Sequence, residues 1–157
     1  MFRLALIQIP LFAAGVGVPG VLAGTSSAAQ AAPQPMLTFR SVFTGVAIDH
    51  QHCTWAGAVD GAARGRLTIA LRQVEEPAAA ANPIWHVTSR WTARDESGVH
   101  SFTAELEGMV DWKAGTLHLG GVITDGWLTG SWVEVDGRVV DGDLVGAVSI
   151  IPALAHR

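Results

Sequence analysis

The sequence has few charged residues, a single cysteine and no run of basic residues. Asp, Glu, Lys and Arg make up 15% of its 157 residues, whereas 49% are of the AVILMFWYC type, a composition typical of one globular domain and not of a disordered chain. The 10 basic and 14 acidic residues are scattered and give a net charge of −4, which argues against nucleic-acid binding. Because Cys53 is the only cysteine, no disulfide forms within the chain.

Several catalytic and cofactor-binding motifs are also missing. The sequence contains no glycine-rich phosphate loop, no G-x-S-x-G, no H-E-x-x-H and no C-x-x-C. Nucleotide-binding, serine hydrolase, zinc protease and thioredoxin-type functions therefore have no support in the sequence, and no cofactor is predicted. The only asparagine, Asn82, is followed by Pro83, which excludes N-glycosylation at that position.

The longest apolar stretch lies at the N-terminus. Arg3 supplies a positive charge, residues 4–14 are almost wholly apolar, and Ala29-Gln30-Ala31 offers small residues of the kind that signal peptidases cleave after. We therefore expect residues 1–31 to be a signal peptide, cleaved before Ala32. Residues 32–157 are then expected to form a single secreted or extracytoplasmic domain.

An uncleaved membrane anchor is the alternative interpretation of this segment. Residues 4–24 contain one strongly polar residue, Gln8, and are long enough to span a bilayer. Pro10, Pro19 and the Ala/Ser/Gln/Pro-rich stretch that follows argue against an anchor. No later stretch is apolar enough to span a membrane, so we expect no stable membrane insertion after cleavage.

The remaining chain has the residue pattern of an all-β protein. Apolar and polar residues alternate most clearly over Ile84 to Asp95, and Gly, Pro and Asp-Gly separate such segments. Ala58 to Arg64 is expected to be a Gly/Ala loop, and Asp136-Gly137 and Asp141-Gly142 are expected to be turns. Strands are predicted at Met36–Ile48, Gly65–Glu75, Ile84–Asp95, Val99–Trp112, Thr116–Thr124, Trp127–Val135 and Asp143–Ile151.

This strand pattern fits two architectures. Short strands at a spacing of roughly ten residues predict a closed antiparallel barrel of about eight strands, or a β-sandwich. Glycines within the predicted strands favour the barrel, because a small barrel needs sharp bends repeatedly. These glycines are Gly108, Gly120, Gly121, Gly130 and Gly146.

Two segments carry a family resemblance. DWKAGTLHLGGVITDGWLTG (111–130) and DLVGAVSI (143–150) resemble small secreted bacterial proteins with an allene oxide cyclase barrel-like domain. The resemblance implies an antiparallel barrel of about eight strands with a central cavity, related to the dirigent and allene oxide cyclase barrels and often without an assigned activity. The shared positions are mostly turns and glycines, which indicate fold more than chemistry, so no pocket residue is carried over.

Tryptophans provide the candidate ligand-binding residues. Four of the six lie on the predicted apolar faces, where they either fill the core or line a cavity for a small apolar ligand. These four are Trp85, Trp91, Trp112 and Trp132.

Two further groups are candidates for chemistry. The candidate metal ligands are His50 and His52, because their two-residue spacing places both on one face of a strand. A further ligand from Asp49, Cys53 or the distant His118 would have to complete the site. Otherwise the segment is a polar loop, and the lone thiol of Cys53 is expected to be buried.

Glu105 and His118 are candidate catalytic residues on neighbouring strands. They act as acid and base if their face lines the barrel interior, whereas they are solvated if it faces outward, with Arg90 and Arg94 pairing across strands with Glu105 or Glu107.

The favoured function is a secreted β-barrel protein that binds a small apolar ligand in its cavity. The alternative is an isomerase- or cyclase-type enzyme that holds an apolar substrate in the barrel and positions it for reaction. The sequence leaves open whether the protein is an enzyme and whether it associates into oligomers.

Overall fold

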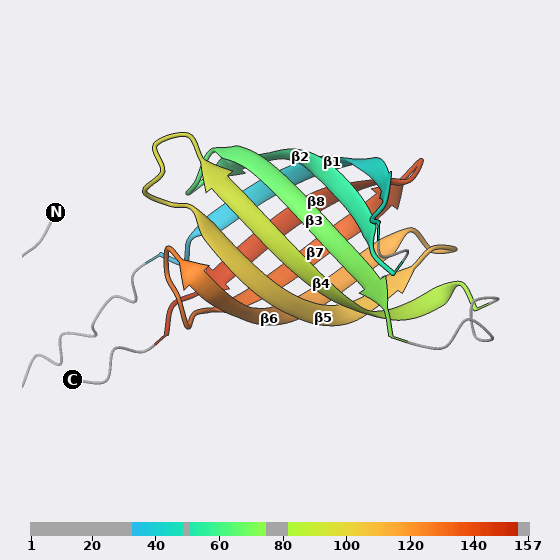
Figure 1. The fold of residues 1–157 in the computed structure, drawn as a ribbon. Coiled ribbons are helices and arrows are strands. Elements are labelled where there is room, and N and C mark those ends of the chain that lie inside the picture. The colour runs from blue at the N-terminus through green and yellow to red at the C-terminus, as the bar shows by residue number, and fades with distance from the viewer. Residues whose placement is uncertain (1–32, 49–50, 75–81, 154–157) are drawn as a thin grey trace, which may run out of the picture. The chain divides into compact units, whose positions relative to one another are not determined.

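A computed structural model describes residues 33–48, 51–74 and 82–153. In it, eight antiparallel strands follow one another around a closed barrel (Figure 1), which confirms the all-β barrel predicted from the sequence. The signal segment expected at residues 1–31 lies outside the described residues, among which there is no helix long and apolar enough to cross a membrane. The strands are β1 (Met36–Val46), β2 (Cys53–Gly61), β3 (Gly65–Gln73), β4 (Ile84–Asp95), β5 (Phe102–Asp111), β6 (Thr116–Gly126), β7 (Trp132–Val140) and β8 (Asp143–Ile151).

Each strand pairs with the next one in sequence, and β1 closes the ring by pairing with β8, with Leu37 opposite Val148. Glycines allow the sheet to curve tightly enough for this closure. At Gly121, for example, a Cβ atom would lie 2.1 Å from the carbonyl oxygen of Glu105 on the neighbouring strand. Gly121 is one of the strand glycines predicted to lie at bends, and the neighbouring backbone lies too close for any side chain at this position.

Alternating side chains of each strand fill the barrel. In β4, Val87, Ser89 and Trp91 are buried, whereas Arg90 between them is exposed. The ring of Trp91 meets that of Phe39 edge-on, with centroids 4.8 Å apart. The middle of the barrel is thus a core of interlocked side chains, as is usual for a barrel of this size.

The structure corrects two predicted segments. Residues Ala58 to Gly61, expected in a loop, belong to β2, whose alternation is hidden in the sequence because alanine and glycine separate Trp55 from Val59. The Asp136-Gly137 pair, expected as a turn, lies inside β7, where it pairs with β6 and β8. Strand β7 accordingly begins at Trp132 and not at Trp127.

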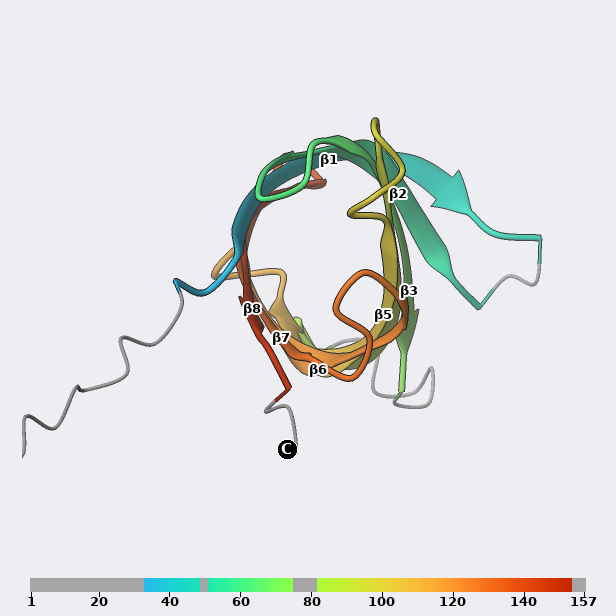
Figure 2. The same ribbon diagram turned by 90° about the vertical axis from the view of Figure 1, so that its left-hand side faces the viewer.

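The two ends of the barrel differ. At one end, called here the closed end, the β6–β7 connection folds across the opening (Figure 2). The backbone N–H of Trp127 in this connection donates to the carbonyl of Ser101, and its ring meets that of His100 with centroids 4.7 Å apart. Trp127 and Leu128 pack against the core from this side.

The opposite end, called here the open end, carries the β1–β2, β3–β4, β5–β6 and β7–β8 connections. Here β1 contains a bulge between Phe43 and Gly45, and the end of β1 and the start of β2 leave the ring (Figure 2). A bulge bends its strand locally. The bend exposes the inner face of β1 at the open end, where Phe43 lies.

Candidate functional site

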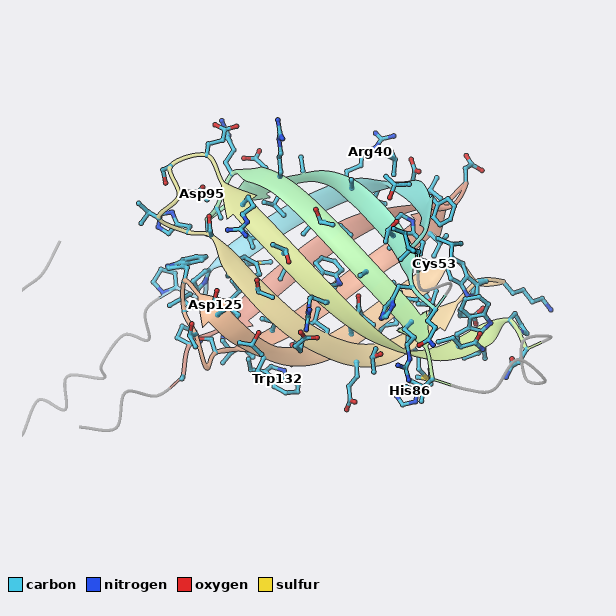
Figure 3. All side chains as sticks on the ribbon, in the orientation of Figure 1. Arg40, Cys53, His86, Asp95, Asp125 and Trp132 are labelled. Carbon is cyan, nitrogen blue, oxygen red and sulfur yellow. The ribbon has the colours of Figure 1, made fainter. Side chains whose placement is uncertain are left out.

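A hollow lined by aromatic side chains occupies the open end of the barrel. It has a volume of about 310 Å³ and is lined by Phe43, Cys53, Trp55, Trp85, Trp112, Asp141 and Gly142. We call this hollow the aromatic cup. Cys53 marks its position in Figure 3. Its lining is almost entirely apolar, and its volume suits a small organic molecule.

Two pairs of rings build the wall of the cup. Phe43 and Trp55 are Cα partners across β1 and β2, and their rings meet edge-on with centroids 5.3 Å apart. The rings of Trp85 and Trp112 meet in the same way at 5.2 Å. Edge-to-face contacts of this kind hold aromatic rings in defined orientations. The cup is therefore a preformed apolar surface.

Trp112 carries a buried polar atom that lacks a hydrogen-bond partner among the described residues. Its backbone N–H donates to the carbonyl of Pro83 at 2.9 Å, which ties the β5–β6 connection to the start of β4. Its indole Nε1 is buried and has no hydrogen-bond partner among the described residues. A buried N–H without an acceptor costs free energy. A ligand acceptor that reached this atom would remove this cost, and because the atom has no exposed surface, neighbouring side chains would have to move to admit it.

Besides the Asp141 carboxylate, two further polar groups of the cup are the Trp55 indole and the Cys53 thiol. Trp55 is 2% exposed, and its Nε1 donates to the carbonyl oxygen of Gly142 at 2.8 Å. Burial raises the pKa of the Cys53 thiol above its ordinary value. The thiol is therefore protonated at neutral pH and contributes apolar surface rather than a reactive thiolate.

Two of the four tryptophans proposed as ligand-binding residues, Trp85 and Trp112, line the cup. Trp91 is 1% exposed and lies in the core, whereas Trp132 is 45% exposed on the outer wall. The placement of Trp132 departs from the apolar face expected for it, because β7 starts five residues later than predicted and has a different alternation. Sequence reasoning missed Trp55, which lies in the strand that was not predicted.

Glu105 and His118 lie on the outer face and not inside the barrel. Glu105 accepts a hydrogen bond from Arg90 Nε at 2.5 Å, as predicted for a cross-strand pair. His118 Nδ1 lies 2.7 Å from Asp136 Oδ1 on β7. Glu105 pairs with Val122 of β6, which is four residues, or about 13 Å of extended strand, from His118. The structure thus separates the two proposed catalytic residues from each other and from the cup.

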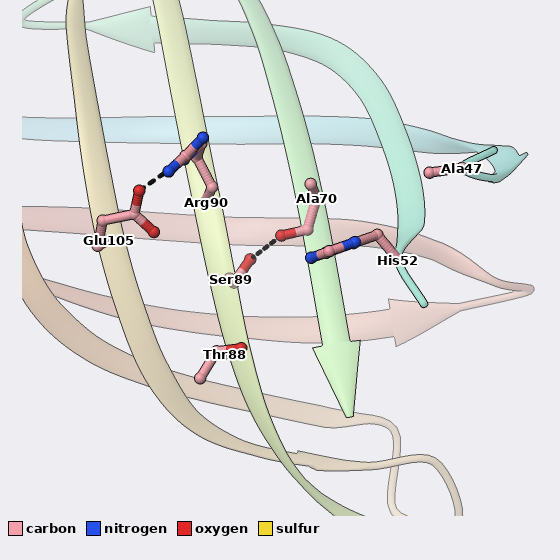
Figure 4. A pocket seen from close by; sticks show the side chains of 7 residues that line it. All are labelled: Ala47, His52, Ala70, Thr88, Ser89, Arg90 and Glu105. Atoms are coloured by element: carbon pink, nitrogen blue, oxygen red, sulfur yellow. Dashed lines mark hydrogen bonds and ion pairs between the residues drawn. The ribbon is translucent and has the colours of Figure 1, made fainter. Parts of the chain in front are cut away.

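A second hollow, of about 430 Å³, lies on the outer wall beneath the β1–β2 hairpin. His52, Arg90 and Glu105 line it, and the His52 ring crosses β3 next to Ala70 (Figure 4). Arg90 and Glu105 already form an ion pair with each other. This hollow therefore offers a ligand fewer unsatisfied groups than the aromatic cup does.

The two proposed metal ligands are not seen together. His50, like Asp49, lies outside the described residues. Within the described ranges, no group of three or more His, Cys, Asp or Glu side chains is placed to hold a metal ion. The paired use of His50 and His52 stays a prediction.

No protein-family model, curated protein or solved structure matches the chain.

Proposed function

We propose that the protein is a secreted β-barrel that binds a small apolar ligand in the aromatic cup. The observation that carries this proposal is the buried Nε1 of Trp112, which has no partner among the described residues, in a hollow otherwise lined by aromatic rings. The apolar lining supplies the affinity, and the Trp112 N–H orients the ligand once neighbouring side chains move to admit an acceptor atom.

This arrangement defines a ligand class. The four rings of the cup favour a flat or extended apolar molecule. The Trp112 N–H favours a molecule that carries one hydrogen-bond acceptor, such as a carbonyl or ether oxygen. An anionic ligand is not expected, because Asp141 is the only ionisable group of the lining besides the Cys53 thiol.

Export and family membership belong to the same proposal. The pattern of residues 1–31 supports a signal peptide. The resemblance of residues 111–130 and 143–150 supports a relationship to the allene oxide cyclase barrel-like proteins, and a closed antiparallel barrel of eight strands is the fold that this resemblance implies. The alternative of an isomerase or cyclase gains no support from Glu105 and His118, because both lie outside the barrel wall.

Native mass spectrometry of the exported, purified protein tests the proposal. We expect a discrete organic adduct on the wild-type chain and a strong reduction of that adduct in the Trp112→Ala variant. Val122→Ala, a truncation on the outer face of β6, is the control and should keep the adduct. If the wild type carries no adduct and also takes up no neutral aromatic compound added in excess, the proposal is overturned.

A further inference from the structure

The outer wall of the barrel is sorted by charge. The outer faces of β1 to β4 carry Arg40, Arg66, Arg72, Arg90 and Arg94. Within the bounds of these four strands, all of which the structure describes, the only outward-facing carboxylate is Asp60, which pairs with Arg64 at 2.8 Å. The outer faces of β5 to β7 instead carry Glu105, Glu107, Glu134 and Asp136, with one arginine, Arg138, near the end of β7. We call these two surfaces the basic face and the acidic face.

The basic face contains an unfavourable contact. Arg66 and Arg94 are Cα partners across β3 and β4, and both are exposed. Like charges directly opposite each other destabilise a pair of strands. Neither guanidinium makes an ion pair within the part of the chain that the structure describes. An anionic surface placed on this pair would relieve the repulsion.

The acidic face contains a socket for a cation. Glu107, Gly120 and Glu134 form one row across β5, β6 and β7. The indole of Trp132 lies over Gly120, so closely that a Cβ on Gly120 would be 2.9 Å from the ring. Trp132 projects from the outer wall (Figure 3). The ring is thus seated between two glutamates, in a hollow of about 330 Å³.

This socket has the chemistry that a guanidinium requires. Arginine stacks on aromatic rings, with tryptophan the best of them, and its N–H groups pair with carboxylates. Glu107 and Glu134 lie two strands apart, about 10 Å, so they bracket a group stacked on the ring. Glu107 and Glu134 themselves make no ion pair among the described residues.

We propose that the acidic face receives arginines from the basic face of a second copy of this chain. The charge complementarity of the two faces selects this occupant, since one molecule carries both the unpaired arginines and the indole between two glutamates. Interfaces of this kind are commonly held by tryptophan and arginine at their centre. The arginine pair Arg66 and Arg94 is the natural counterpart of the Trp132 socket.

The placement of the two faces determines the form of the assembly. The basic face lies on β1 to β4 and the acidic face on β5 to β7, which are opposite halves of the closed ring. Arg40 and Trp132 accordingly project from opposite sides of the barrel (Figure 3). Contacts between different faces do not close on themselves in a dimer. The chain therefore associates head to tail, and the assembly grows with concentration.

Sedimentation velocity at several protein and salt concentrations tests this association. Screening shortens the range of charge interactions from about 30 Å at 0.01 M salt to about 3 Å at 1 M. We expect the average mass to rise with protein concentration at low salt and to return to that of the monomer at high salt. A monomer at every protein and salt concentration would overturn the proposal.

Two variants identify the faces. Trp132→Ala removes the ring of the socket but leaves the basic face. Arg94→Glu reverses one charge of the arginine pair on the basic face but leaves the socket. Each alone is expected to weaken association at least tenfold. A mixture of the two variants is expected to form dimers that grow no further. In such a dimer the intact basic face of Trp132→Ala binds the intact socket of Arg94→Glu, and no further pair of intact faces remains. Lys113→Glu, a charge reversal in the β5–β6 connection outside both faces, is the control and should associate as the wild type does.

Three other results would contradict the proposal. One is wild-type association by both variants. Another is a mixture that stays monomeric although both variants retain the wild-type circular dichroism spectrum. The third is a chain that stays monomeric at low salt but binds an immobilised sulfated polysaccharide through Arg66 and Arg94, which would assign the basic face to an anionic polymer instead.

Discussion

The indole Nε1 of Trp55 donates a hydrogen bond of 2.8 Å to the carbonyl oxygen of Gly142. This bond joins strand β2 to the β7–β8 turn across the mouth of the barrel. It satisfies the polar atom of a tryptophan that is 2% exposed. In the same cup, the Nε1 of Trp112 is buried without a partner among the described residues. Two tryptophans of one site therefore differ in what they offer a ligand, and Trp112 is the one with a donor to give.

Replacing Trp55 with phenylalanine should lower the free energy of unfolding by about 1 kcal/mol or somewhat more, because the ring is largely kept while the hydrogen bond to Gly142 is lost. Trp55→Ala should cost about 3–5 kcal/mol, since it also leaves a cavity. Urea unfolding monitored by circular dichroism measures both. A Trp55→Phe variant as stable as the wild type would show that the hydrogen bond contributes nothing.

Two adjacent glycines should respond very differently to alanine. At Gly121 the new Cβ would lie 2.1 Å from a backbone carbonyl oxygen, whereas at Gly120 it would lie 2.9 Å from a ring atom of Trp132. A strand backbone cannot yield locally, but an exposed side chain can. We expect Gly121→Ala to lose about 3 kcal/mol or more and Gly120→Ala to change stability by about 0.5 kcal/mol at most. Thermal unfolding of both variants compares them directly.

Asp95 should make stability depend on pH in acid solution. Hydrogen bonds from the Ser97 hydroxyl and from the backbone N–H of Arg64 lower the pKa of Asp95 from 3.8 to about 2 in the folded state. A carboxyl with a depressed folded-state pKa stabilises the fold above its unfolded-state value, and this contribution is lost as the pH falls through the folded-state value.

The Asp95→Asn variant measures this contribution. It should be less stable than the wild type above about pH 4, and the difference should shrink as the pH falls toward 2. Asp60, whose pKa is lowered by hydrogen bonding to Arg64, is present in both proteins and cancels in the comparison. A difference that stays constant from pH 5 to pH 2 would contradict the assigned role of Asp95.

The exposed charged pairs should matter little for stability or for the cup. The Arg90 and Glu105 side chains are 67% and 44% exposed, and exposed pairs contribute about 0.2–1 kcal/mol at most. Glu105→Gln and His118→Ala should therefore leave the affinity of the cup for an apolar probe within about twofold of the wild type. A loss of turnover in either variant, with probe binding intact, would instead revive the enzymatic alternative.

The sequence predicts the barrel better than the site. Large apolar residues at every second position, such as Val87 and Trp91, reveal β4 directly. In β2 the same alternation is masked by Ala56, Gly57 and Ala58. Pairing with β1 and β3 decides the conformation of this segment, and its partners in β1, such as Leu37, are distant in sequence. Local pattern alone does not contain that information.

Alternation identifies Trp85, which lies in β4, and Trp112, which directly follows β5, because both segments are predicted in the correct phase. Trp132 is predicted on the apolar face because the strand is expected to start at Trp127, whereas β7 starts at Trp132 and turns this side chain outward. The charge-sorted outer wall was missed altogether. Its arginines are far apart in the sequence, and only the register of the strands, for example Arg66 opposite Arg94, brings them together.

The most direct test of the aromatic cup is titration with a neutral naphthylamine dye, followed by its fluorescence, for the wild type, Trp112→Phe and Trp112→Ala. Competition with matched apolar compounds, with and without a carbonyl group, then isolates the Trp112 N–H. We predict that the wild type prefers the carbonyl compound about tenfold, which corresponds to one hydrogen bond to a buried donor. Trp112→Phe should bind the dye but lose this preference. Trp112→Ala should bind the dye weakly. Equal dye affinity for all three proteins would show that the ligand does not bind in the cup.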